Sequence, residues 1–222
     1  MRLRITFAKT DAMRFTGHLD LHRAWERALR RARLPLAYSL GFNPHPRINL
    51  ACALPLGFTS EGEVVDVWLE KDLPIAEVEA ALLVALPPGI QLLGIQEEEG
   101  RAAALQTHVE ASEYIITLLE PCPNLDDRCA ALLDAPSLPR RRRSKDYDLR
   151  PLIHNLHILL QDEQGYQRLF ACLCAQEGAT GRPEEVLEVL GLAPEAARVH
   201  RLRLVFRMPD TGSSTPGLLG EP

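Results

Sequence analysis

A chain of 222 residues, 46% of them hydrophobic and 25% charged, has the composition of a globular protein with room for one large domain or two small ones. No apolar run approaches the roughly 18 residues of a membrane helix, and the charged N-terminus lacks the apolar core of a signal peptide, so we expect a cytoplasmic protein with no membrane attachment. The five cysteines include no CxxC pair, and the sequence therefore predicts no zinc site and no other bound metal.

The net charge of −5 hides an uneven distribution along the chain. Residues 1–50 carry ten Arg and Lys against three Asp and Glu, whereas residues 51–137 carry three against sixteen. A second basic segment, 138–150, carries six against two. An acidic chain with two concentrated basic segments is not a general binder of polyanions, and this pattern favours a protein that presents positive charge at one place.

The first hundred residues predict the element order β-α-β-β-α-β. Residues 2–8 alternate between apolar and polar as a strand does, and residues 18–33 carry apolar side chains at helical spacing up to Pro35, which ends the helix. Strands at 47–54 and 63–69, a helix at 74–86 and a strand at 90–96 are expected to follow. This order is that of a ferredoxin-like domain, which we place at residues 1–97.

Residues 98–107 are predicted to link this domain to a second domain at 108–207, where the same order is expected. The predicted strands cover 108–119, 152–160, 167–175 and 198–206, and the predicted helices cover 125–134 and 183–190, with the basic stretch leading into the second strand. The expected fold is therefore α+β, built from tandem ferredoxin-like halves with antiparallel sheets. Residues 208–222 have no hydrophobic periodicity and are predicted to be a disordered tail.

Arginines supply the strongest functional signal. They crowd the first predicted helix, largely opposite its apolar stripe, and recur in the second basic segment. A solvated helix face is the alternative, but Arg is suited to bidentate phosphate contacts, which favours RNA. The candidate RNA-binding residues are Arg23, Arg27, Arg30, Arg31, Arg47, Arg140, Arg141, Arg142, Arg143 and Lys145. If the two clusters line one groove for a phosphate backbone, they must lie close together in the fold.

Signals for catalysis are sparse. There is no G-x-S-x-G elbow, no P-loop and no dinucleotide-binding G-x-G-x-x-G. His18 and His22 stand four residues apart but have no evident third ligand for a metal. His18, Asp20 and His45 are the candidates for acid–base chemistry, and nothing pairs them with a nucleophile. The sequence therefore favours a binding protein over an autonomous enzyme.

The segment 15–69 resembles the radical-SAM-linked proteins, a bacterial family of unknown function. The matching motifs are FTGHLD at 15–20, RALRRA at 27–32 and SLGFNPHP at 39–46, and KDYDLRP at 145–151 resembles the second family motif. One departure is Gly17, where the family has Ser. The motif loop consists of Ser39, Gly41, Phe42, Asn43, Pro44, His45 and Pro46.

The resemblance implies a radical SAM protein as partner, with S-adenosylmethionine and the iron–sulfur cluster on that partner and no cofactor in this chain. An Arg-rich helix followed by a Gly-Phe-Asn-Pro loop is also similar, at the level of fold, to the repeat-associated endonucleases that process CRISPR RNA; this is an analogy.

Three functions remain open. We expect an accessory RNA-binding module for the radical SAM partner, in which Asn43, His45 and Arg47 shape a loop that touches the partner or the target base. The first alternative is an RNA-processing or tRNA-modifying enzyme with His18, Asp20 and His45 near its chemistry. The second is a protein–protein interaction module without nucleic acid.

Overall fold

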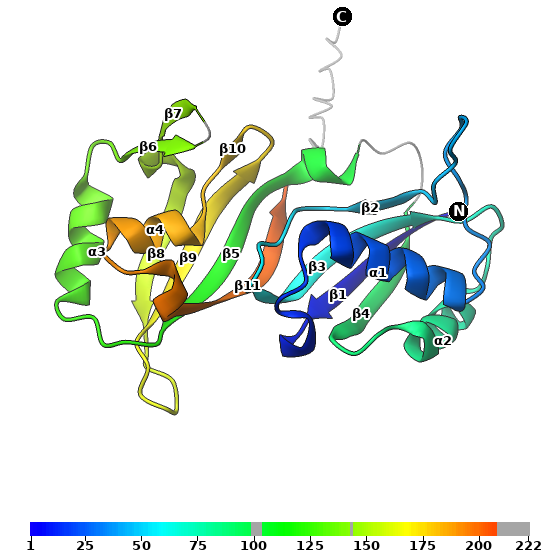
Figure 1. Ribbon diagram of the computed structural model, residues 1–222, viewed down its shortest axis with the longest axis horizontal. Coiled ribbons are helices and arrows are strands. Elements are labelled where there is room, and N and C mark those ends of the chain that lie inside the picture. Colours follow the sequence, from blue (N-terminus) through cyan, green and yellow to red (C-terminus); the bar gives the residue numbers. More distant parts are fainter. Residues whose placement is uncertain (99–103, 143, 208–222) are drawn as a thin grey trace, which may run out of the picture.

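The computed structural model describes residues 1–98, 104–142 and 144–207 (Figure 1). Half of the expected linker, residues 99–103, lies outside these ranges, as do Arg143 and the expected tail at 208–222. No helix in the described ranges is long and apolar enough to cross a membrane.

The N-terminal half follows the predicted element order. Its elements are β1 (Arg2–Lys9), α1 (His18–Arg31), β2 (Ile48–Leu50), β3 (Thr59–Trp68), α2 (Ile75–Ala85) and β4 (Ile90–Glu97). The strand expected at 47–54 is limited to Ile48–Leu50, because the chain then leaves the sheet as a loop over residues 51–58 that contains Pro55. β3 begins four residues before the predicted start of that strand.

The C-terminal half contains an additional hairpin. Its elements are β5 (Val109–Leu118), α3 (Leu125–Asp134), β6 (Pro139–Arg142), β7 (Lys145–Asp148), β8 (Ile153–Leu159), β9 (Arg168–Gln176), β10 (Ala179–Thr180), α4 (Pro183–Val189) and β11 (Ala197–Phe206). The basic stretch does not lead directly into β8 as predicted but forms the β6–β7 hairpin. Asp148 closes this hairpin, since its Oδ1 accepts hydrogen bonds from the backbone N–H groups of Leu138 (2.7 Å) and Arg150 (2.9 Å).

Apart from the β6–β7 hairpin, which is a separate two-stranded sheet, the strands of both halves join in one mixed but mostly antiparallel sheet, so the α+β class is confirmed. The strand order is β10-β9-β5-β11-β3-β1-β4, with β2 also beside β3 and β8 also beside β9. The halves meet where β11 pairs with β3 in parallel over only two residue pairs. Gly62 is required at this junction, because a Cβ there would lie 2.4 Å from the carbonyl oxygen of Leu202.

Two separate hydrophobic cores pack on the face of the sheet that the helices cover. In the N-terminal core, Trp25 of α1 meets Phe7 of β1 edge to face, with 4.9 Å between ring centroids, and Val78 and Leu82 of α2 complete the packing. The C-terminal core packs α3 and α4 on β5, β8 and β9. Leu105 in the expected linker is fully buried in a third, small cluster, so this part of the linker is packed.

Candidate functional site

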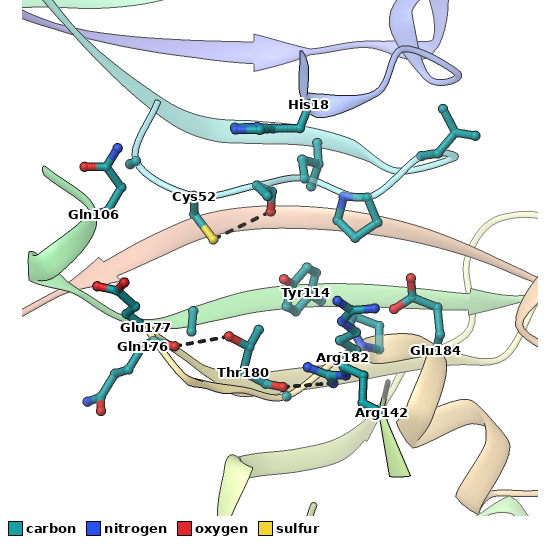
Figure 2. Close-up of a pocket in the computed structure, with 18 of the residues that line it drawn as sticks. His18, Cys52, Gln106, Tyr114, Arg142, Gln176, Glu177, Thr180, Arg182 and Glu184 are labelled. Atoms are coloured by element: carbon teal, nitrogen blue, oxygen red, sulfur yellow. Dashed lines mark hydrogen bonds between the residues drawn. The ribbon is translucent and has the colours of Figure 1, made fainter. Parts of the chain in front are cut away.

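A pocket of about 790 Å³ lies between the two halves; we call it the central pocket. It is lined by the start of α1, the loop at 51–56, β5, the β6–β7 hairpin, β10 and the start of α4. Figure 2 shows His18 on one side of the pocket and Thr180, Arg142 and Arg182 on the other, with Tyr114 between them. Its volume is in the range of about 300–1,000 Å³ that is typical of ligand sites.

A buried ion pair holds one wall of the central pocket. Arg201 of β11 and Glu63 of β3 are both buried, and their side chains meet through two hydrogen bonds, Nε to Oε1 at 2.7 Å and Nη2 to Oε2 at 2.5 Å. The remaining amino group of Arg201 donates to the carbonyl oxygen of Ala53 at 3.1 Å. Because buried charges require partners, this pair fixes the loop at 51–56 against the sheet.

We call the junction of β3 and β11, where the two halves meet, the seam. Lys9 adds a second buried cation near it. Its side chain has no exposed surface, and its ammonium group donates to the carbonyl oxygens of Phe58 (3.0 Å) and Arg14 (3.2 Å). Burial lowers the pKa of Lys9 to about 8, although the nearby carboxylate of Glu63 opposes the shift. Lys9 thus ties the end of β1 to the loop that forms the pocket wall.

Besides Arg142, three residues of the central pocket have shifted pKa values. Burial, reinforced by His22, lowers the pKa of His18, so its imidazole is neutral at pH 7, and its Nδ1 is buried without a hydrogen-bond partner in the described structure. Burial raises the pKa of the Tyr114 phenol, although Arg201 and Ser112 oppose this shift. Burial also raises the pKa of Glu184. Such shifts cluster at functional sites, although structural ion-pair networks cause them too.

A second pocket, of about 740 Å³, adjoins the first and shares Arg142, Thr180 and Arg182 with it. Arg142 is held in place at this boundary, because one guanidinium nitrogen contacts both carboxylate oxygens of Glu185 at 2.7 Å. Arg182 and Lys145, which line the second pocket, are exposed and have no ion pair within the described ranges. The two pockets therefore adjoin at a boundary that carries a fixed guanidinium, and two unpaired cations line the second pocket.

The structure brings His18 and Arg142 together in the central pocket but not the other acid–base candidates. Asp20 lies on the exposed side of α1, where its carboxylate accepts a hydrogen bond from Arg23 at 3.1 Å. His45 lies in the exposed motif loop, where its backbone N–H donates to Ser39 Oγ at 3.0 Å. That loop projects beside the N-terminus, at the end of the sheet away from the C-terminal half (Figure 1), and none of its residues lines the central pocket. The structure therefore does not bring His18, Asp20 and His45 together at one site.

The two arginine clusters do not form one groove. The helix α1 packs on β1 through Trp25 and Phe7. Arg142 instead donates a hydrogen bond to the carbonyl oxygen of Thr180 in β10, the strand at the opposite end of the sheet. On the first cluster, Arg30 pairs with Glu26 and Arg47 stacks on Trp68. Arg23 pairs with Asp20, and Arg27 and Arg31 are exposed.

The candidate RNA-binding residues of the β6–β7 hairpin differ in exposure and in contacts. The Nε of Arg140 is buried without a partner in the described structure. Arg141 is exposed, 3.8 Å from Asp146, while Arg142 and Lys145 line pockets. Six further residues at or near the central pocket were not predicted from the sequence: Lys9, Glu63, Tyr114, Arg182, Glu184 and Arg201. The sequence pattern could have predicted burial for three of them. Lys9, Glu63 and Arg201 each occupy the inward-facing position next to the apolar ones of a strand.

No group of three or more His, Cys, Asp or Glu side chains that could hold a metal occurs in the described ranges.

Comparisons with known proteins give a family and a fold. Residues 2–183 match a family described as an uncharacterized protein conserved in bacteria (DUF2344). A comparison with curated proteins finds no match.

Among solved structures, the chain is similar to one from a Cbf5-Nop10-Gar1 complex, with a TM-score of 0.50 and 14% identity over 93% of this chain and 50% of that one. It therefore spans about half of that chain, and at this identity the likeness shows the fold alone. An H/ACA RNP bound to a substrate RNA containing 2'-deoxyuridine matches with a TM-score of 0.44 and 9% identity, covering 91% of this chain and 45% of that one. A CRISPR-associated protein from Thermus thermophilus matches with a TM-score of 0.21 and 14% identity, covering 90% and 99%. Neither of the last two supports an argument.

Proposed function

We propose that this chain, which belongs to the bacterial family DUF2344, is an RNA-binding protein that holds a single strand across the central pocket. The observation that carries this proposal is the pair of adjoining pockets, with Arg142 fixed at their shared boundary; we propose that the two form one path for the strand. Fold likeness to a component of the Cbf5-Nop10-Gar1 complex does not by itself assign a function.

The chemistry of the path suits nucleotides in sequence. Arg182 and Lys145 supply accessible positive charge for phosphates. Arg142 is already held by Glu185, so it adds a positioned donor and little net charge. The neutral imidazole of His18 and the protonated phenol of Tyr114 offer hydrogen-bonding groups for a base edge. Recognition of unstacked bases in pockets is typical of single-stranded RNA, because a duplex keeps its bases stacked.

Fluorescence anisotropy with labelled single-stranded RNA homopolymers, at two salt concentrations, tests this function. The variant Arg182→Glu with Lys145→Glu should bind at least about tenfold more weakly and depend less on salt. The matched control, Arg27→Glu with Arg31→Glu, makes the same charge change at the other end of the sheet and should bind as wild type does. Equal binding by wild type and the path variant refutes the proposal. An equal loss in both variants also refutes it, because it indicates nonspecific attraction.

A second candidate function is an enzyme that acts on the bound RNA. The presence of the His18 imidazole and the Glu184 carboxyl group in the same pocket favours it, because such groups serve as bases and acids in catalysis, and burial shifts the pKa of both. Mass spectrometry of RNA incubated with wild type and with His18→Ala distinguishes the two functions. A product formed by wild type and lost in the variant supports an enzyme, and unchanged RNA supports binding alone.

Two finer proposals accompany this function. We propose that each half is a ferredoxin-like unit, supported by the orders β4-β1-β3-β2 and β11-β5-β9-β8. We also propose a radical SAM partner that carries S-adenosylmethionine and the iron–sulfur cluster, which rests on the motif resemblance at 15–69 alone. Co-purification of the two proteins from their own cells tests the partner, and a failure to associate would leave RNA binding unaffected.

A further inference from the structure

The outer face of α2 is unusually apolar for an exposed surface. The helix has the sequence IAEVEAALLVA, and only Val78, Leu82 and Ala85 are buried against the sheet. On the other side Leu83 is 61% exposed and Val84 is 89% exposed. Exposed apolar side chains that lie together on one face of a helix mark an interaction site. The outer face of α2 is therefore a candidate interaction surface.

A second exposed apolar feature lies at the same end of the molecule. Leu40 and Phe42, in the motif loop at 39–46, have fully exposed side chains. The loop is closed at its base by a bridge between Tyr38 and Pro46 and by the hydrogen bond from Ser39 N–H to the His45 carbonyl oxygen at 2.8 Å. The two apolar side chains thus project from a braced loop. Figure 1 shows this loop and α2 at the same end of the sheet.

The charges around the two features are opposite. Glu77 and Glu79 are exposed on α2 beside its apolar face. Arg31 and Arg33, at the C-terminal end of α1 just before the loop, are exposed and have no ion pair within the described ranges. One surface is therefore apolar and acidic, and the other is apolar and basic, so the chain itself supplies both members of a complementary pair.

We propose that two copies of this chain form a symmetric dimer in which the loop at 39–46 of each copy packs on the outer face of α2 of the other. Both surfaces lie at one end of the molecule, so a single two-fold axis can engage both at once and close the assembly. A second copy explains the acidic and the basic surface together. The dimer leaves the central pocket free, and it is independent of the RNA-binding proposal.

Gel filtration with light scattering tests the dimer. The expected wild-type mass is twice the chain mass of 24.7 kDa. Phe42→Glu and Val84→Glu should each give monomers, because each places a carboxylate in the apolar contact. Leu160→Glu is the matched control, since Leu160 is 88% exposed and lies in the C-terminal half after β8; this variant should remain dimeric. Circular dichroism confirms that each variant is folded.

Charge reversal provides a second readout that depends on complementarity. Glu77→Arg with Glu79→Arg should raise the dissociation constant at least tenfold, and so should Arg31→Glu with Arg33→Glu. All four substitutions in one chain should restore association, because the two surfaces exchange their signs. A wild-type mass of 24.7 kDa at every concentration overturns the proposal. Dimers that survive both Phe42→Glu and Val84→Glu also overturn it.

Discussion

Replacing the buried pair of Arg201 and Glu63 should reveal a strong asymmetry between single and double substitutions. Both side chains are almost without exposed surface, at 0% and 3%. Removing one partner leaves an uncompensated buried charge, which costs about 3–5 kcal/mol in such pairs. We therefore expect Arg201→Met and Glu63→Met each to lower the free energy of unfolding by this amount.

The double variant should be far more stable than either single one. Replacing both members of a buried ion pair by apolar residues of similar volume is often neutral or even stabilising. The remaining loss is the hydrogen bond from Arg201 to the carbonyl oxygen of Ala53, worth about 1 kcal/mol. The double variant should thus fall within about 1–2 kcal/mol of wild type, against a sum of about 6–10 kcal/mol for two independent losses.

Urea unfolding followed by fluorescence of Trp25 and Trp68 measures these energies. The same single and double substitutions at Arg203 and Glu113 are a matched control. The guanidinium of Arg203 donates two hydrogen bonds to the carboxylate of Glu113, at 2.7 and 2.9 Å, but the side chain of Arg203 is 68% exposed. Each control substitution should cost no more than about 1 kcal/mol. Single variants at Arg201 and Glu63 that cost as little as the control would show that water reaches the seam. A double variant that loses the full sum would refute the ion-pair explanation.

Two further predictions concern the same region. Gly62→Ala should lower stability by about 1–3 kcal/mol in urea unfolding, since its Cβ would lie 2.4 Å from the Leu202 carbonyl oxygen, whereas Gly94→Ala meets nothing within 4 Å and should be tolerated. Burial lowers the pKa of Lys9 from 10.5 to about 8, so between these values the unfolded chain binds more protons than the folded chain and stability rises with pH. In Lys9→Met that rise should be absent; an identical pH profile in both proteins would contradict the assignment.

Most helices and strands could be predicted from the sequence because their side chains follow a local period. The helix α3 occupies the predicted residues 125–134, and its inward positions Leu125, Cys129 and Leu132 repeat at helical spacing. The β6–β7 hairpin was missed because consecutive arginines hide its alternation. Only the structure shows that Arg140 and Arg142 are less exposed than Pro139 and Arg141.

The candidate site was less predictable, because it depends on contacts between distant segments. His18 was singled out as a titratable group and Arg142 as a phosphate ligand, but no local pattern places them at the same pocket. Their meeting depends on the pairing of β11 with β3, and Arg201 and Glu63 are 138 residues apart in the chain. Charged residues at inward strand positions were the available signal, and they indicate a polar seam between two apolar cores.

At the seam, side chains from each half contact the other half, so the attachment does not depend on strand pairing alone. Leu54 and Phe58 belong to the N-terminal half by sequence but are buried in the C-terminal core. In the other direction, Arg201 crosses to Glu63 in the N-terminal half and holds the carbonyl of Ala53. Because the direct strand pairing covers only two residue pairs, these contacts carry much of the attachment. The loop at 51–56 is thus fixed from both sides, so the central pocket, which this loop lines, requires both halves.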